Sequence, residues 1–120
     1  MSNNNLVRNV QTRTIASETP TPIVFKWEGL SVLIVIKIIA RNNANTKQYV
    51  RSVLYRIAEG GSAGQQDDAQ NNGFSFAAGG DVFDSSVDGQ LTLNIETDAA
   101  FGESSDWFFQ YEYIEFPDPL

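Results

Sequence analysis

Apolar and polar residues alternate with a period of two along most of the chain, which is the spacing of a β-strand rather than of a helix. The longest apolar run, residues 31–41, is rich in Val and Ile, whose branched side chains suit a pleated sheet. One set of alternate residues in this run is wholly apolar, and the other set contains Lys37 and Arg41. The run is shorter than the roughly 18 apolar residues of a membrane span. We therefore predict a central strand with one face in a core and the other mostly covered, opening to water or to a partner at its far end.

Further strands are predicted wherever the alternation returns between turn signals. The runs with this pattern cover residues 11–17, 23–27, 48–57, 91–96 and 107–116. The turn signals are a pair of prolines at 20 and 22, an Asn-rich segment at 42–46 and an Asp-Gly pair at 88–89. We therefore predict an all-β fold: an antiparallel β-sandwich or jelly roll of about seven to eight strands with an extended N-terminal arm.

The chain divides into three predicted regions. Residues 1–13 are Asn-rich and weakly patterned, and we expect an extended arm that is either frayed or ordered only on a partner. Residues 14–116 form the sandwich domain, and residues 117–120 form a C-terminal tail. Within the domain, residues 58–73 are almost wholly polar, which predicts a long solvated loop. This loop lacks the ligand spacing of a calcium site.

The last predicted strand has two apolar faces. Four aromatic residues on one face are expected in the core: Trp107, Phe109, Tyr111 and Tyr113. The other face still carries Phe108, Ile114 and Phe116, an apolar surface that a monomer would need to cover, which indicates self-association. Together with the arm, this face gives the candidate partner-binding residues: Leu6, Arg8, Val10, Arg13, Phe108, Ile114 and Phe116.

Charge is divided unevenly along the chain. Residues 1–56 hold all eight cations and two acids, a net charge of +6, whereas the remaining residues hold 13 acids and no cation. Two interpretations are open. Strands from the two halves pair and neutralise one another, or a basic face and an acidic face dock on unlike surfaces. The overall charge of −7 argues against nucleic acid as a direct partner.

The chain contains neither Cys nor His. This composition excludes disulfides, thiolate nucleophiles, Cys/His zinc sites and Ser-His triads. Carboxylates are abundant in the second half of the chain, so their proximity is no evidence of glycosidase chemistry. We therefore expect no enzyme, and we assign no catalytic, cofactor-binding or metal-binding residues.

The order of features from Thr14 to Phe116, about 85% of the chain, resembles a β-sandwich module of phage and prophage virion proteins, often found near the ends of tail-fibre or other structural chains. The matching segments are Glu18-Thr19-Pro20-Thr21-Pro22, Ile38-Ile39-Ala40-Arg41, Tyr49 to Tyr55-Arg56, Leu91 to Ile95, and Trp107 to Tyr113. The resemblance implies a structural protein of the virion, assembled in the host cytoplasm.

Three functions are compatible with this resemblance and with the residues. The small free-standing domain and its arm favour a capsid decoration (cement) protein that bridges capsomers, typically as a homotrimer bound to the major capsid protein. The alternative is a component of the tail, neck or fibre bound to another virion protein. A carbohydrate-binding module is a third hypothesis, for which Trp27 and Trp107 are the candidates, although both fit core positions. We expect neither a membrane nor a nucleic acid as a partner.

Overall fold

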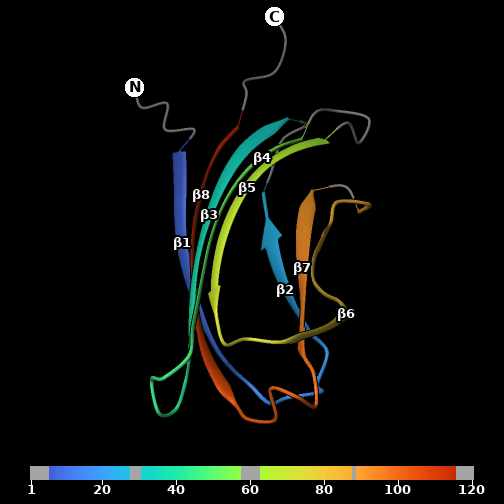
Figure 1. Cartoon of the computed structure of the whole chain (residues 1–120). Coiled ribbons are helices and arrows are strands. Elements are labelled where there is room, and N and C mark those ends of the chain that lie inside the picture. The colour runs from blue at the N-terminus through green and yellow to red at the C-terminus, as the bar shows by residue number, and fades with distance from the viewer. Residues whose placement is uncertain (1–5, 28–30, 58–62, 88, 116–120) are drawn as a thin grey trace, which may run out of the picture.

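The computed structural model describes residues 6–27, 31–57, 63–87 and 89–115, and these residues form a sandwich of two antiparallel sheets. The eight strands are β1 (Leu6–Ile15), β2 (Thr21–Lys26), β3 (Val32–Asn42), β4 (Gln48–Ile57), β5 (Ala63–Asn72), β6 (Phe76–Asp84), β7 (Gln90–Thr97) and β8 (Ser105–Glu115). The predicted fold class is therefore confirmed (Figure 1).

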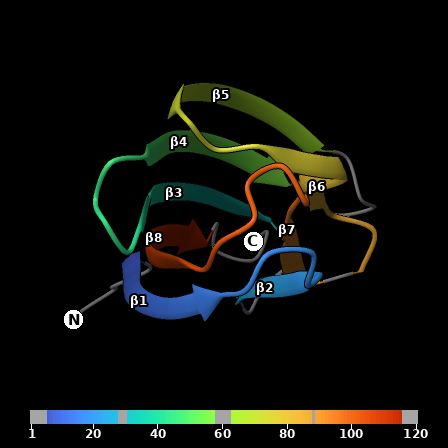
Figure 2. The same cartoon turned by 60° about the horizontal axis from the view of Figure 1, so that its bottom comes forward.

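The two sheets differ in size. Five strands form one sheet in the order β1-β8-β3-β4-β5, and three form the other in the order β2-β7-β6. The three-stranded sheet lies against one face of the five-stranded sheet, and no described strand covers the opposite face (Figures 1 and 2). The described part of the chain contains no helix that could cross a membrane.

The core lies between the sheets and is organised around β3, as its apolar pattern predicts. The alternate residues Val32, Ile34, Ile36, Ile38 and Ala40 are all at most 2% exposed. On one side β3 pairs with β8, whose four inward-facing aromatic side chains are buried, and on the other side it pairs with β4. A set of alternate residues from the smaller sheet closes the core: Ile23, Phe25, Leu91, Leu93 and Ile95.

The predicted loop over residues 58–73 is wrong for residues 63–72, which form β5 and pair with β4 along its whole length. The polar pattern arises because β5 is an edge strand whose residues from Gln65 to Asn72 are all exposed as whole residues, although the Asp67 side chain points inward. When the opposing sheet does not cover an edge strand, both faces of that strand can carry polar side chains. Residues 58–62 of the predicted loop lie outside the described residues.

The expected N-terminal arm is also part of the sheet from Leu6 onward. Residues 6–15 form β1, which is paired with β8 from Leu6 opposite Ile114 to Ile15 opposite Ser105. The pairing runs through the boundary predicted between residues 13 and 14 without interruption. The weak apolar pattern of this segment is that of an edge strand with one buried anchor, Ile15.

Candidate functional site

The candidate site is the face of the five-stranded sheet that points away from the three-stranded sheet, which we call the outer face. It is formed by alternate residues of each strand: the even-numbered residues of β1, β5, β8 and β4, and the odd-numbered residues of β3. The register aligns these residues in rows across the sheet. Ile39, for example, lies opposite Phe108 on β8 and opposite Val50 on β4.

Exposed apolar side chains are concentrated on the outer face. Eight large hydrophobic residues are exposed in the described part of the chain, and six of them belong to this face: Val10, Ile39, Val50, Leu54, Phe108 and Ile114. The other two, Val82 and Val87, lie on or beside the smaller sheet. Phe108, Ile39 and Val50 form one row across three neighbouring strands, which we call the apolar band. A contiguous apolar surface of this kind is typical of an interaction site.

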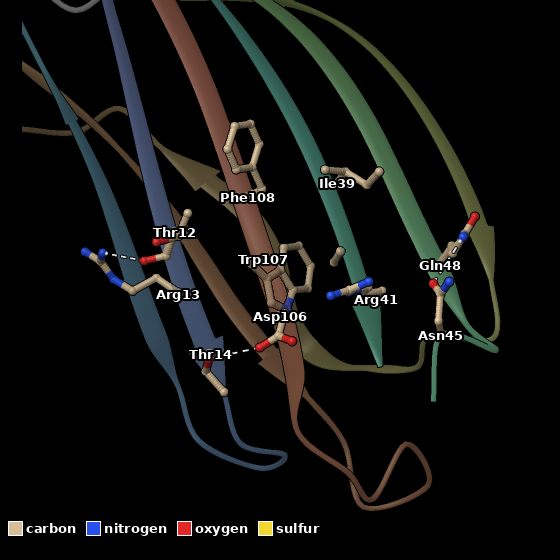
Figure 3. A pocket seen from close by; sticks show the side chains of 11 residues that line it. Thr12, Arg13, Thr14, Ile39, Arg41, Asn45, Gln48, Asp106, Trp107 and Phe108 are labelled. Carbon is tan, nitrogen blue, oxygen red and sulfur yellow. Dashed lines mark hydrogen bonds between the residues drawn. The ribbon is translucent and has the colours of Figure 1, made fainter. Parts of the chain in front are cut away.

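The apolar band lies between two depressions. The first is lined by Thr12, Arg41, Gln48 and Asp106 together with the band residues Ile39 and Phe108 (Figure 3). In it, the Thr14 hydroxyl donates a hydrogen bond of 2.9 Å to Asp106 Oδ1. The second depression is lined by the band together with Lys37, Ser52 and Gln110. The apolar band therefore contributes to both depressions, of which the first has a mixed lining and the second a mainly apolar one.

The outer face is not acidic, unlike the chain as a whole. It carries four cations, Arg8, Lys37, Arg41 and Arg56, and three acids, Asp68, Asp106 and Glu112. Its net charge is thus +1, whereas the whole chain has a net charge of −7. An ion pair of 3.1 Å joins Arg8 Nε to Glu112 Oε2 on neighbouring strands. Because this pair is exposed, it contributes little to stability and stays accessible to a partner.

The uneven charge of the sequence is partly neutralised by strand pairing. The four ion pairs that described residues form with one another all join a cation of the first half to an acid of the second half: Arg8–Glu112, Lys47–Glu103, Arg51–Asp67 and Arg51–Asp81. The first follows from the topology, because β1 from the beginning of the chain pairs with β8 from its end. Of the two interpretations of the charge pattern, these pairs support neutralisation within the fold.

A second polar cluster lies inside the sandwich, around the buried Arg51 on β4. Its guanidinium donates hydrogen bonds to Asp67 on β5, including one of 2.8 Å from Nε to Oδ1. It also donates one of 2.8 Å from Nη1 to Asp81 Oδ1 on β6. The Tyr49 hydroxyl donates to the same Asp81 carboxylate. The cluster joins both sheets and faces inward, so we regard it as a structural joint rather than a binding site.

The two carboxylates of this cluster have opposite pKa shifts. The hydrogen bond from Arg51 holds the pKa of Asp67 below its ordinary value. Burial raises the pKa of Asp81, although Tyr49 and Arg51 both donate to that carboxylate. No group of acidic residues in the described ranges is arranged to hold a metal ion.

The structure brings most of the predicted partner-binding residues to one face. Arg8, Val10, Phe108 and Ile114 lie on the outer face, and the backbone of Leu6 lies opposite Ile114. Two predicted residues are placed differently. Arg13 belongs to the other set of alternate β1 residues, opposite the core residue Trp107, although it still lines the first depression at the edge of the sheet (Figure 3). Phe116 lies outside the described residues. None of this tests partner binding, which stays a prediction.

Sequence reasoning missed three apolar residues of the outer face, Ile39, Val50 and Leu54. Each belongs to the set of alternate residues that also contains charges, on β3 or on β4. The available signal was that both strands carry apolar residues on their second face as well as on their core face. Both tryptophans are in the core, Trp27 at 8% and Trp107 at 2% exposure, so neither presents a ring to a sugar.

No protein-family model matches the chain, and no curated protein matches it. Among solved structures, the chain is similar to the tailspike protein of Acinetobacter baumannii phage AM24, with a TM-score of 0.42 and 6% sequence identity. The match covers 96% of this chain and 27% of the tailspike chain. The chain thus spans about a quarter of the tailspike's length, and the similarity is a distant one of β-sheet architecture.

Proposed function

We propose that this chain is a structural module of a phage virion, and that it belongs to the tail or fibre rather than to the capsid shell. The observation that carries the proposal is the outer face, where six of the eight exposed large hydrophobic residues gather on one side of the sandwich. Such a surface supports assembly with other protein chains. The sequence resemblance over Thr14 to Phe116 supports the virion as the place of assembly.

The tail or fibre is favoured over capsid decoration because of β1. The decoration hypothesis relied on the small free-standing domain and on an arm over residues 1–13 that lies along the shell. From Leu6 onward this segment is instead an edge strand paired with β8. A strand held in this way cannot also extend over a neighbouring capsomer without leaving its sheet, which would expose one edge of β8.

The test is the copy number of the chain in purified particles of the phage or prophage that encodes it, measured by quantitative mass spectrometry on intact virions and on separated tails. The proposal predicts a small number of copies, in multiples of three or six, that purify with the tails. Copies in proportion to the major shell protein would instead establish capsid decoration. Absence from virions and tails alike would overturn the virion assignment.

A further inference from the structure

We propose that the outer face is occupied by a second copy of this chain, so that the apolar band of each copy packs against the outer face of its neighbour. The inference rests on the proposed function, because it names the partner of the same surface. The test of this self-association uses the purified chain. Self-association can therefore fail while the virion assignment stands, and the virion assignment can fail while self-association stands.

The outer face is large enough to form a protein–protein interface. Five strands spaced by about 4.8 Å, each contributing about ten residues at about 3.3 Å per residue, give a face of about 24 by 33 Å, or about 800 Å². This is about the area that each partner contributes to a standard stable protein–protein interface. The outer face alone is therefore large enough for specific association between copies.

The other strand surfaces of the molecule are more polar than the outer face. The exposed face of the smaller sheet carries the polar residues Thr92, Asn94 and Glu96 of β7, and among its described residues only Val82 of β6 is a large exposed hydrophobic one. The edge strand β5 is polar from Gln65 to Asn72 except for Ala69, and β1 carries Arg8 and Arg13 along the other edge. Charged and polar edges oppose the addition of further strands. The outer face is thus the surface suited to packing sheet against sheet.

The distribution of charge also favours contact between outer faces. Two copies with a net charge of −7 each repel one another over most of their surfaces. The outer face has four cations and three acids interspersed, a net charge of +1. Because the whole chain has a net charge of −7, the rest of each chain has a net charge of −8. Copies that approach through their outer faces therefore bring together surfaces of mixed sign and keep their acidic surfaces apart. The other surfaces of this chain would offer an unrelated acidic partner fewer apolar contacts than the outer face offers.

The shape of the outer face also suits packing against a second copy. The apolar band of Phe108, Ile39 and Val50 lies between two depressions, one lined partly by Arg41 and the other partly by Lys37. The band of one copy can enter a depression of its neighbour, where the aliphatic stems of these long cationic side chains cover apolar atoms. Reciprocal insertion satisfies the self-complementarity that association between identical chains requires.

The experiment is sedimentation velocity on the full chain at concentrations up to about 100 µM, well above the micromolar Kd that interfaces of standard size reach at their weakest. The wild-type chain should sediment as a multiple of its 13.3 kDa mass. Ile39→Glu should weaken association by at least about tenfold, because it places a charge in the centre of the packed faces. Circular dichroism confirms that the variant is folded.

The matched control is Val82→Glu. Val82 is 54% exposed and Ile39 is 51% exposed, and both lie on strands, but Val82 belongs to the smaller sheet. The control should associate like the wild type. A wild-type chain that stays monomeric over the whole concentration range would overturn the proposal, and so would equal weakening by both substitutions.

Discussion

At the scale of single residues, Arg51 is the side chain on which most of the polar structure of the interior depends. It is 7% exposed, lies at hydrogen-bond distance from Asp67 and Asp81, and packs with its guanidinium carbon 4.9 Å from the centre of the Phe83 ring. A buried cation is tolerated only when its charge and its donors are satisfied. Arg51 thus selects the register in which Asp67 of β5 faces inward.

We expect Asp67→Asn to lower the free energy of unfolding by about 2 kcal/mol, because it leaves the Arg51 charge with one carboxylate in place of two. The value is below that for a fully buried pair, since the Asp67 side chain is 27% exposed and water can replace part of the contact. Urea denaturation at neutral pH measures this decrease in the free energy of unfolding. The neighbouring Asp68→Asn is the control and should change stability by less than about 0.5 kcal/mol, because Asp68 is exposed on the outer face. Equal effects of the two substitutions would contradict this role of Arg51.

The opposite pKa shifts of Asp67 and Asp81 predict opposite pH dependences. Asp67 has a lowered folded-state pKa, so its contribution to stability is present above its ordinary pKa of 3.8 and is lost as the pH falls through the folded value. Asp81 has a raised pKa, so its contribution is present below 3.8 and is lost as the pH rises through the folded value. Relative to wild type, Asp67→Asn should therefore lose less stability on acidification, and Asp81→Asn should lose more. Urea denaturation from about pH 6 to about pH 2.5 distinguishes them, and parallel curves would refute the prediction.

At the scale of secondary-structure elements, β6 is the irregular strand of the sandwich. Its pairing with β7 shifts register between Phe76 and Asp81, and Gly79 lies within the shift with φ at +73°. A Cβ on Gly80 would overlap the carbonyl oxygen of Glu96 and lie 2.9 Å from that of Ala77. The bulge therefore brings backbone against backbone, which only glycine allows.

We expect Gly80→Ala to lower the free energy of unfolding by about 2 to 3 kcal/mol, because the carbonyl groups around it belong to the backbone and cannot rotate away like a side chain. Gly79→Ala is the matched comparison. Its Cβ would meet no neighbouring atom within 4 Å, so only the positive φ is unfavourable, at about 1 kcal/mol. Thermal unfolding of both variants gives the order of their stabilities. A Gly79→Ala variant less stable than Gly80→Ala would contradict the prediction.

The elements that the sequence predicted correctly are those with one face in the core. In β3 and β8 the burial of one set of alternate residues dictates apolar side chains there, so the period of two is visible in the sequence. Of the two edge strands of the larger sheet, β1 was recognised only in its second half, by the strand predicted over residues 11–17, and β5 was not recognised. Asp67 points inward, yet it is polar because its partner is the Arg51 guanidinium rather than an apolar core. That pairing depends on tertiary structure, which a local pattern does not contain.

At the scale of the whole molecule, the order of the strands explains why part of the candidate site was predictable. Phe108 and Ile114 were identified because a second apolar face on β8 is unusual beside four buried aromatic residues. Joining Ile39 and Val50 to Phe108 requires knowing that β3 lies between β4 and β8, and that the register aligns these three residues. This information arises only when residues distant in sequence are placed side by side.

Association through the outer face has a thermodynamic consequence for the whole molecule. If folded copies bind one another and unfolded chains do not, the unfolding midpoint rises with protein concentration by mass action. A tenfold increase adds about 1.4 kcal/mol to the stability of a pair of chains, which corresponds to a rise of about 3 °C for a pair of this combined length. Differential scanning calorimetry at several concentrations measures the rise. Ile39→Glu should abolish the concentration dependence and Val82→Glu should keep it, because only Ile39 lies in the apolar band. A wild-type midpoint independent of concentration would mean that the outer face stays open to water until a different partner covers it.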